Sequence, residues 1–179
     1  MDRERKVTLY FVEEREVKSE ELAPDSFHSV ASLDPGTRTF QSIFDADGNA
    51  VEWGAGDCSQ IMYHCRRADN LQSKIAKQND KHKGWYLKRA YYRTLRKLKD
   101  KVKECHRKLA LFLCENYRVV LIPKFEVSRM VKKAKRNINN KTVRSMYTWS
   151  HFSFRQSLLE KAKEHPWCRV VEVDEAYTS

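Results

Sequence analysis

The strongest constraint on the fold is a heptad repeat of apolar residues near the middle of the chain. The repeat advances in alternating steps of four and three residues, through Tyr91, Leu95, Leu98, Val102, Cys105, Leu109 and Phe112. This spacing predicts one continuous α-helix with an apolar seam. We expect the helix over about 85–116, with a length on the order of 48 Å at 1.5 Å per residue.

A second helix is expected immediately before it. Apolar residues recur at helical spacing from Ile61 to Ile75, and the following Lys81-His82-Lys83-Gly84 is typical of a turn. A short connection of this kind predicts an antiparallel helical hairpin over about 58–116. The chain has only 5 Gly in 179 residues, which favours long elements over a sandwich of many short strands.

Strand patterns occur on both sides of the hairpin. Alternating apolar residues predict a strand within 5–17, and a short apolar strand runs from His28 to Leu33. The remaining predicted elements are a β-hairpin over 39–53 with its turn at 45–48, a buried strand at 118–122 and a basic loop or poorly ordered lid at 132–144. They are followed by an amphipathic helix, which is marked by apolar residues from Trp149 to Ala162 and ends near His165-Pro166, and by a last strand at 169–173. This order predicts an α/β fold in which helices flank a mixed sheet.

The basic charge of the chain is concentrated in the predicted hairpin. Residues 66–108 hold 16 Lys and Arg against 4 acids, whereas the rest of the chain holds 19 against 20. A second basic cluster comprises Lys132, Lys133, Lys135, Arg136, Lys141 and Arg144. Concentrated positive charge attracts polyanions by counterion release. The alternative interpretation is a solvated helix face on an intramolecular coiled-coil arm.

Several classes of protein are excluded by composition. No apolar run is long enough for a transmembrane helix, and the first residues lack the apolar core of a secretory signal. The 5 Cys form no CxxC pair, so we expect reduced, mostly packed thiols and neither a disulfide framework nor a zinc site. We therefore expect an intracellular protein with no membrane partner, and the choice between nucleus and cytoplasm stays open.

Two carboxylates occupy the positions where catalytic acids are often found. Asp34 ends the first core strand within Asp34-Pro35-Gly36, and Glu126 follows the buried strand at 118–122. If these strands are neighbours, both acids lie at one edge of the sheet, where oxygen ligands suit Mg²⁺ or Mn²⁺. Arg38 is then placed to contact a phosphate. Taken alone, Asp-Pro-Gly is also a common turn.

The two carboxylate segments resemble a known family when they are taken together with a third segment. SLDPGTRTF (32–40) resembles the first motif of the RuvC-like nuclease domain, and VVLIPKFEVSRM (119–130) resembles its second motif. VVEVDEAYTS (170–179) resembles the strand that leads into that domain's zinc-ribbon insertion. The order of the three segments, with a basic helical pair between the first two, is similar to TnpB and Fanzor proteins, which are RNA-guided DNA endonucleases of mobile elements.

The resemblance implies a fold, a chemistry and a set of partners. The fold is RNase H-like (RuvC-like), with the hairpin inserted in a domain over 28–179 and residues 1–27 as part of an amino-terminal wedge. Asp34 and Glu126 become the catalytic and metal-binding residues, with Mg²⁺ or Mn²⁺ as the cofactor, and DNA and a guide RNA become the partners. The expected nucleic-acid-binding residues are Arg38, Arg89, Arg93, Arg96, Lys97, Lys132, Lys133, Lys135, Arg136 and Arg144.

The sequence departs from the family pattern at its end. The zinc ribbon and the third carboxylate motif of the family are not present before Ser179, so zinc is not expected and the active site is incomplete. Asp174 and Glu175 either approach the metal site or form a polar strand end. Three hypotheses follow: a segment of a metal-dependent endonuclease that is inactive alone, a catalytically dead remnant or split-gene half that only binds nucleic acid, and a helical-hairpin protein-interaction module.

Overall fold

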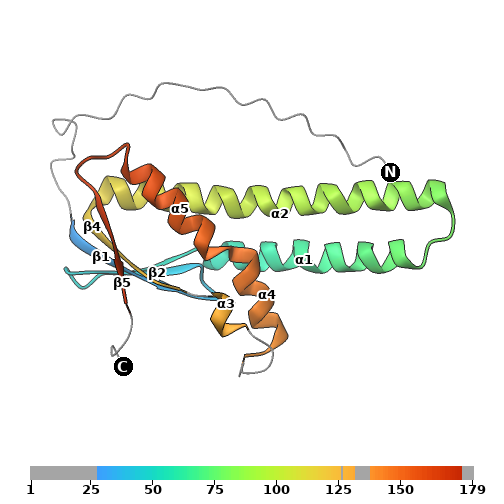
Figure 1. Ribbon diagram of the computed structural model, residues 1–179, viewed down its shortest axis with the longest axis horizontal. Helices are drawn as coiled ribbons and strands as arrows, with labels where there is room; N and C mark the ends of the chain where they lie inside the picture. Colours follow the sequence, from blue (N-terminus) through green and yellow to red (C-terminus); the bar gives the residue numbers. More distant parts are fainter. Residues whose placement is uncertain (1–27, 126, 132–137, 175–179) are drawn as a thin grey trace.

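The protein is built around a five-stranded mixed β-sheet (Figure 1). The computed structural model describes residues 28–125, 127–131 and 138–174. The strands are β1 (His28–Pro35), β2 (Gln41–Asp45), β3 (Ala50–Trp53), β4 (Tyr117–Pro123) and β5 (Arg169–Val173), in the spatial order β3-β2-β1-β4-β5. The first three strands are antiparallel, whereas β4 runs parallel to β1 and β5 runs parallel to β4. The mixed α/β fold predicted from the sequence is thus confirmed.

The predicted helical hairpin forms a long arm that projects from one end of the sheet (Figure 1). It consists of α1 (Ala55–Ala76) and α2 (Lys81–Asn116), which lie side by side and are joined by a four-residue connection. The prediction of a turn at 81–84 was wrong, because the Asp80 side chain accepts hydrogen bonds from the backbone N–H groups of His82 and Lys83. This capping starts α2 at Lys81.

The heptad seam lies where the sequence predicts it. Val102, Cys105 and Leu109 are buried, and the seam residues closer to the end of the arm, such as Leu95 and Leu98, are half-buried. The seam faces α1 along the arm and the sheet at its carboxyl end, where Leu113 and its neighbours join the core. A single helix therefore serves first as a coiled-coil partner and then as a layer over the sheet.

The last helical region contains a break that the sequence analysis missed. The helix predicted from Trp149 is present as α5 (His151–Ala162), and it is preceded by α4 (Asn140–Trp149) and a short α3 (Val127–Met130), which the sequence analysis did not predict. Ser150 separates α4 from α5 in the left-handed conformation, with φ of 49°. Asn139 caps α4 by accepting a hydrogen bond from the Thr142 N–H, so the predicted loop at 132–144 is wrong for its last residues.

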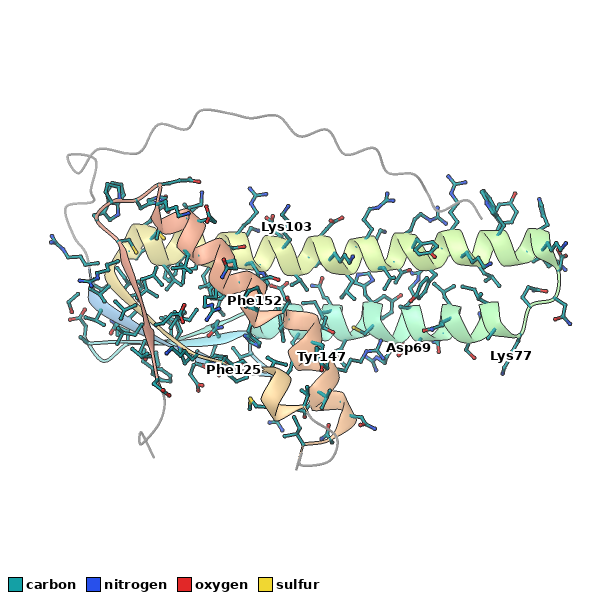
Figure 2. The ribbon with its side chains drawn as sticks, in the orientation of Figure 1. Asp69, Lys77, Lys103, Phe125, Tyr147 and Phe152 are labelled. Carbon is teal, nitrogen blue, oxygen red and sulfur yellow. The ribbon has the colours of Figure 1, made fainter. Side chains whose placement is uncertain are left out.

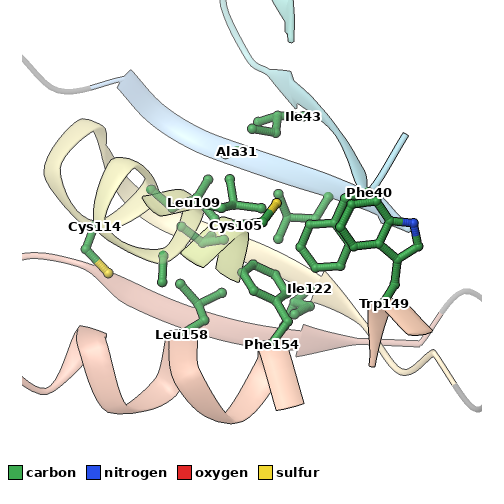
Figure 3. Close-up of a cluster of buried hydrophobic side chains, with 14 of the residues drawn as sticks. Ala31, Phe40, Ile43, Cys105, Leu109, Cys114, Ile122, Trp149, Phe154 and Leu158 are labelled. Atoms are coloured by element: carbon green, nitrogen blue, oxygen red, sulfur yellow. The ribbon is translucent and has the colours of Figure 1, made fainter. Parts of the chain in front are cut away.

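The core lies between the sheet and the helices α2 and α5 (Figure 3). Phe40 is at its centre, with its ring centroid 4.7 Å from that of Trp149 and 5.1 Å from that of Phe154. Gly54 closes the same region with φ of 80°, and a Cβ at this position would lie 2.8 Å from Phe40 Cβ. Glycine is therefore required there for both conformation and space.

Helices cover only one face of the sheet in the described part of the chain. Ala31 and Leu33 of β1 are buried against the helices, whereas Ser32 and Asp34 point to the opposite face and are exposed. The side chain paired with Ser32, Phe44 of β2, is 49% exposed on that same face. The predicted strand within 5–17 lies outside the described residues. No helix in the described ranges has the length and apolarity needed to cross a membrane.

Candidate functional site

The parallel pairing of β1 and β4 creates the sheet edge at which the two carboxylates were expected. Asp34 is the penultimate residue of β1, is exposed, and pairs in register with Ser42 of β2. β4 runs beside β1 in the same direction, so both strands end at the same edge. The structure therefore places Asp34 where the sequence predicts it. Glu126 follows β4 but lies outside the described residues, so its approach to Asp34 stays a prediction.

The loop after Asp34 is fixed by its own backbone and by a hydrogen bond from α4. The Gly36 N–H donates to the Phe40 carbonyl at 3.2 Å, and a Cβ on Gly36 would lie 2.5 Å from the Thr39 carbonyl oxygen. The Thr37 carbonyl accepts a hydrogen bond of 2.8 Å from the Ser145 hydroxyl of α4. These hydrogen bonds hold the loop after Asp34 in place, and Arg38 is exposed on its surface.

A cavity of about 620 Å³ opens at the same end of the sheet, on the helix-covered side. Its walls come from the ends of β1, β4 and β5, from the starts of β2 and α3, from the segment after β4, and from α5. The lining residues are Pro35, Gln41, Ile122, Pro123, Lys124, Phe125, Val127, His151, Phe152, Phe154, Arg155 and Glu172. The volume lies within the range of small-ligand pockets.

Two buried polar side chains lie in the wall of this cavity. Gln41 Nε2 is 3.4 Å from His151 Nδ1, while Gln41 Oε1 and His151 Nε2 have no hydrogen-bond partner among the described residues. Burial, with a smaller contribution from His106, lowers the pKa of His151 to about 4, so its imidazole is neutral at pH 7. Nearby, Arg155 Nη1 lies 3.1 Å from Glu172 Oε2, which joins α5 to β5. The sequence analysis did not single out any of these residues.

The described carboxylates do not complete a metal site at Asp34. In the described ranges, the side chains that could converge on one ion are His28, Asp45 and Asp47, at the opposite end of β1. There His28 Nδ1 is 2.7 Å from Asp47 Oδ2. Asp45 is held mainly by Asn49, whose hydrogen bond keeps the pKa of Asp45 below its ordinary value. This cluster closes the β2–β3 turn and does not contribute to the Asp34 edge.

The hairpin displays four of the ten predicted nucleic-acid-binding residues. Arg89, Arg93, Arg96 and Lys97 are all exposed on α2. The guanidinium of Arg89 lies 5.4 Å from the ring centroid of Trp85, which is itself 47% exposed. The structure therefore brings cations and exposed aromatic rings together on the arm. Lys132, Lys133, Lys135 and Arg136 lie outside the described residues, so their role stays a prediction.

Arg144 has a structural contact that sequence reasoning did not foresee. Its two terminal nitrogens bind the two carboxylate oxygens of Asp69 on α1, and Nη2 also donates to the Cys65 carbonyl at 3.2 Å. The hydrogen bond to Asp69 raises the pKa of Arg144. Arg144 therefore joins α4 to α1. This contact engages the guanidinium that the sequence analysis assigned to nucleic-acid binding.

The cysteines are packed as expected from their spacing. Cys65, Cys105, Cys114 and Cys168 are buried, Cys58 is half-buried, and all are free thiols. Burial raises the pKa of Cys105 to about 12, which keeps this thiol protonated at neutral pH. The thiols thus belong to the core and not to the candidate site.

The fold and surface define a mixed α/β domain that carries a basic, aromatic-bearing helical arm. No family model matches the chain. It is 28% identical over 153 residues to a protein of Paramecium bursaria Chlorella virus 1 that is provisionally named a transposase. The match covers 84% of this chain and 34% of the viral protein, so the chain spans about a third of that relative's length. The comparison supports a transposase-like relationship.

Proposed function

We propose that the protein is a nucleic-acid-binding member of a transposon-associated, RuvC-like lineage related to TnpB and Fanzor proteins. The observation that carries the proposal is the exposed basic surface of α2. This surface is attached to a sheet whose edge presents Asp34. The similarity to the viral protein named as a transposase supports the same conclusion.

The electrostatic argument favours a polyanionic partner over a solvated coiled-coil arm. Residues 66–108 hold 16 basic and 4 acidic residues, and one of those acids, Asp69, is occupied by Arg144. Another, Glu104, lies 3.3 Å from Lys108. A solvated helix is usually supported by alternating charges along its surface. An excess of cations is instead suited to phosphates, which release counterions when they are neutralised.

The sheet topology supports the RNase H-like part of the proposal. Three antiparallel strands come first, and two further strands are added in parallel on the other side of β1. The helical arm is inserted between β3 and β4, which is the position expected from the resemblance. In this arrangement β1 is central and its carboxyl end, with Asp34, lies beside the end of β4.

Nucleic-acid binding is tested by anisotropy titrations with labelled oligonucleotides between 50 and 200 mM salt. The logarithm of the association constant is expected to fall linearly with the logarithm of salt concentration, with a slope of about −0.7 to −0.9 for each phosphate contact. Combined Arg89→Ala, Arg93→Ala and Arg96→Ala changes are expected to weaken binding and flatten the slope.

The matched control for that experiment removes cations elsewhere. Lys161 at the end of α5 lies 2.7 Å from Glu164 Oε2, and Lys163, the residue after the helix, lies 2.8 Å from Glu160 Oε1. Their replacement by Ala is expected to leave affinity unchanged. Undetectable binding at 50 mM salt, or a slope near zero, contradicts the proposal and favours a protein-interaction module.

Metal-dependent phosphodiester cleavage is a second candidate function, and the position of Asp34 at the β1–β4 edge favours it. Mg²⁺ or Mn²⁺ held by carboxylates would supply the activation of water and the stabilisation of the leaving oxygen. Asp34 is a single carboxylate in the described site, so this candidate depends on Glu126, Asp174 or Glu175, or on a further carboxylate.

The test for cleavage is the incubation of labelled single-stranded DNA with each metal ion. Asp34→Asn is expected to abolish any nicking, and Glu52→Gln, which changes an exposed carboxylate on the same sheet, is expected to preserve it. Nicking that survives Asp34→Asn excludes Asp34 as the catalytic residue. Binding without nicking leaves the protein in the class that binds nucleic acid only.

A further inference from the structure

The outward side of α2 carries a continuous stripe of cations and aromatic rings. The stripe contains exposed residues at successive steps of three or four, namely Trp85, Arg89, Tyr92, Arg96, Lys99, Lys103 and Arg107. Residues at these steps lie on one side of a helix. The stripe is therefore about 33 Å long at 1.5 Å per residue. It is hereafter called the α2 stripe.

The α2 stripe is directed away from the rest of the molecule. Cys105, which is buried in the seam, lies on the opposite side of the helix. Lys103 points away from α1 in Figure 2, where α1 and α2 run side by side. One exposed acid, Asp100, borders the stripe, because it lies four residues after Arg96 and three before Lys103. The surface therefore presents five cations beside a single acid.

The two aromatic rings of the stripe are exposed, and ring contacts hold them in place. Trp85 is 47% exposed, has Arg89 at 5.4 Å from its ring, and meets the Tyr86 ring edge-on at 4.9 Å between centroids. Tyr92 is 46% exposed and is held by an edge contact with Tyr91 at 5.6 Å. Exposed apolar groups that adjoin one another and are rimmed by polar residues, as Trp85 and Tyr86 are beside Arg89, mark interaction sites.

We propose that the α2 stripe binds single-stranded nucleic acid, with unpaired bases stacked on Trp85 and Tyr92 and phosphates bound by the five cations. The inference rests on the proposed nucleic-acid-binding function and specifies its ligand. Stacking on aromatic side chains requires bases that are not paired within a duplex, whereas the cations bind a backbone of any sequence. A length of about 33 Å accommodates several nucleotides, comparable with the site sizes of single-strand binders.

A duplex or a protein partner fits the stripe less well. A duplex keeps its bases stacked inside and offers only phosphates to a helix on its surface, which leaves Trp85 and Tyr92 without a partner. A protein interface is depleted of charged residues at its core, whereas five of the seven stripe positions are cations. The combination of rings and cations is the one that single-strand binders use.

The test compares one oligonucleotide as a single strand and as a duplex, using the full chain and anisotropy at fixed salt. The single strand is expected to bind at least tenfold more tightly. The double change Trp85→Ala and Tyr92→Ala is expected to weaken single-strand binding by about thirtyfold or more without changing its salt slope. Lys103→Ala with Arg107→Ala is expected to make the slope shallower by about 1.4.

The controls separate stacking from folding and from exposure of aromatic rings in general. Tyr63 of α1 and Tyr147 of α4 are 54% and 62% exposed but lie outside the stripe, so Tyr63→Ala with Tyr147→Ala is expected to have no effect. Trp85→Phe with Tyr92→Phe is expected to retain most of the affinity. The variants change exposed side chains, and circular dichroism with thermal melting verifies that each one is folded.

The outcomes distinguish this inference from the function on which it rests. Equal affinity for single strand and duplex, together with no loss on changing Trp85 and Tyr92 to Ala, overturns the single-strand inference and leaves nucleic-acid binding in place. Failure of the unchanged protein to bind either form at low salt overturns both. Tighter binding of the single strand, with the loss confined to the stripe variants, supports the inference.

Discussion

The guanidinium of Arg144 on α4 and the carboxylate of Asp69 on α1 form a two-point ion pair across two elements that are far apart in sequence. Arg144 Nη2 lies 2.9 Å from Asp69 Oδ1, and the same nitrogen reaches the Cys65 carbonyl. The pair ties α4 to the base of the helical arm. Arg144 is thus one cation of the second basic cluster that protein groups already engage.

Arg144→Ala is expected to lower the free energy of unfolding by about 1 kcal/mol, since paired geometry strengthens an otherwise modest, partly exposed ion pair. Arg144→Lys is expected to recover little, because an ammonium cannot make the two-point contact. Urea denaturation of both variants, of Asp69→Asn and of the double variant measures the coupling. A coupling energy near zero contradicts a structural role for the pair, and an intact fold with reduced nucleic-acid affinity returns Arg144 to the binding surface.

Acid is expected to destabilise the fold through two buried histidines. His106 Nε2 lies 2.8 Å from the Trp149 carbonyl, and burial lowers the pKa of His106 and of His151 to about 4. Both rings pack against Phe40. A histidine whose pKa is lower in the folded state stabilises the fold fully above its ordinary pKa of 6.5, and this contribution is lost as the pH falls toward 4. The loss is about 2 kcal/mol per histidine at pH 5.

Chemical denaturation at pH 8, 7, 6 and 5 measures this effect. His106→Gln is expected to cost stability at pH 8 but to make stability less dependent on pH. His82, which is exposed on α2, provides the control, and His82→Gln is expected to leave the pH dependence unchanged. A stability that is constant from pH 8 to pH 5 in the unchanged protein contradicts the prediction.

The sequence alone predicted the elements that carry a clear local signal. The heptad from Tyr91 to Phe112 predicted α2 because the pattern repeats along the helix. The Asp-Gly pair of the turn at 45–48 predicted the β2–β3 hairpin, because it suits the positive φ angles of a tight turn. The sequence analysis took the pairing of β1 with β4 as a condition for bringing Asp34 and Glu126 to one sheet edge, and the structure shows that the two strands pair in parallel.

The missed features depend on single residues and on tertiary contacts. The break at Ser150 has no Gly or Pro to mark it, and the chain accepts a left-handed serine there while Trp149 and Phe154 both reach the core. Likewise, only the fold brings Gln41 within 3.4 Å of His151, since the two are 110 residues apart in sequence. The ion pair of Arg144 was unpredictable for the same reason.

Gly54→Ala is expected to destabilise the protein by about 2 to 4 kcal/mol. The residue has φ of 80°, which costs a non-glycine residue about 1 kcal/mol. The added Cβ would also lie 2.8 Å from Phe40 Cβ and 3.4 Å from Trp149, where the core has no space to yield.

Gly56→Ala is the matched control in the first turn of α1. A Cβ there meets nothing within 4 Å, so this change is expected to be neutral or to stabilise the helix by up to about 1 kcal/mol. Equal melting temperatures for the two variants would contradict the prediction.

Asp80→Ala tests the signal that the turn prediction overlooked. Asp80 Oδ1 accepts hydrogen bonds of 2.8 Å and 3.2 Å from the backbone N–H groups of His82 and Lys83. Removal of this side chain leaves the two N–H groups in the first turn of α2 without their acceptor. The loss is expected to cost about 1 kcal/mol, while Asp80→Ser, which keeps an acceptor, costs less.

Because the cap lies at the far end of the arm, the loss is expected as fraying near Trp85 and not as unfolding of the sheet. Amide hydrogen exchange resolves the two: faster exchange confined to the first turns of α2 agrees with the prediction, whereas unchanged protection there contradicts a capping role. If the α2 stripe binds single strands, Asp80→Ala should also weaken binding, because Trp85 and Arg89 lie within the frayed turns.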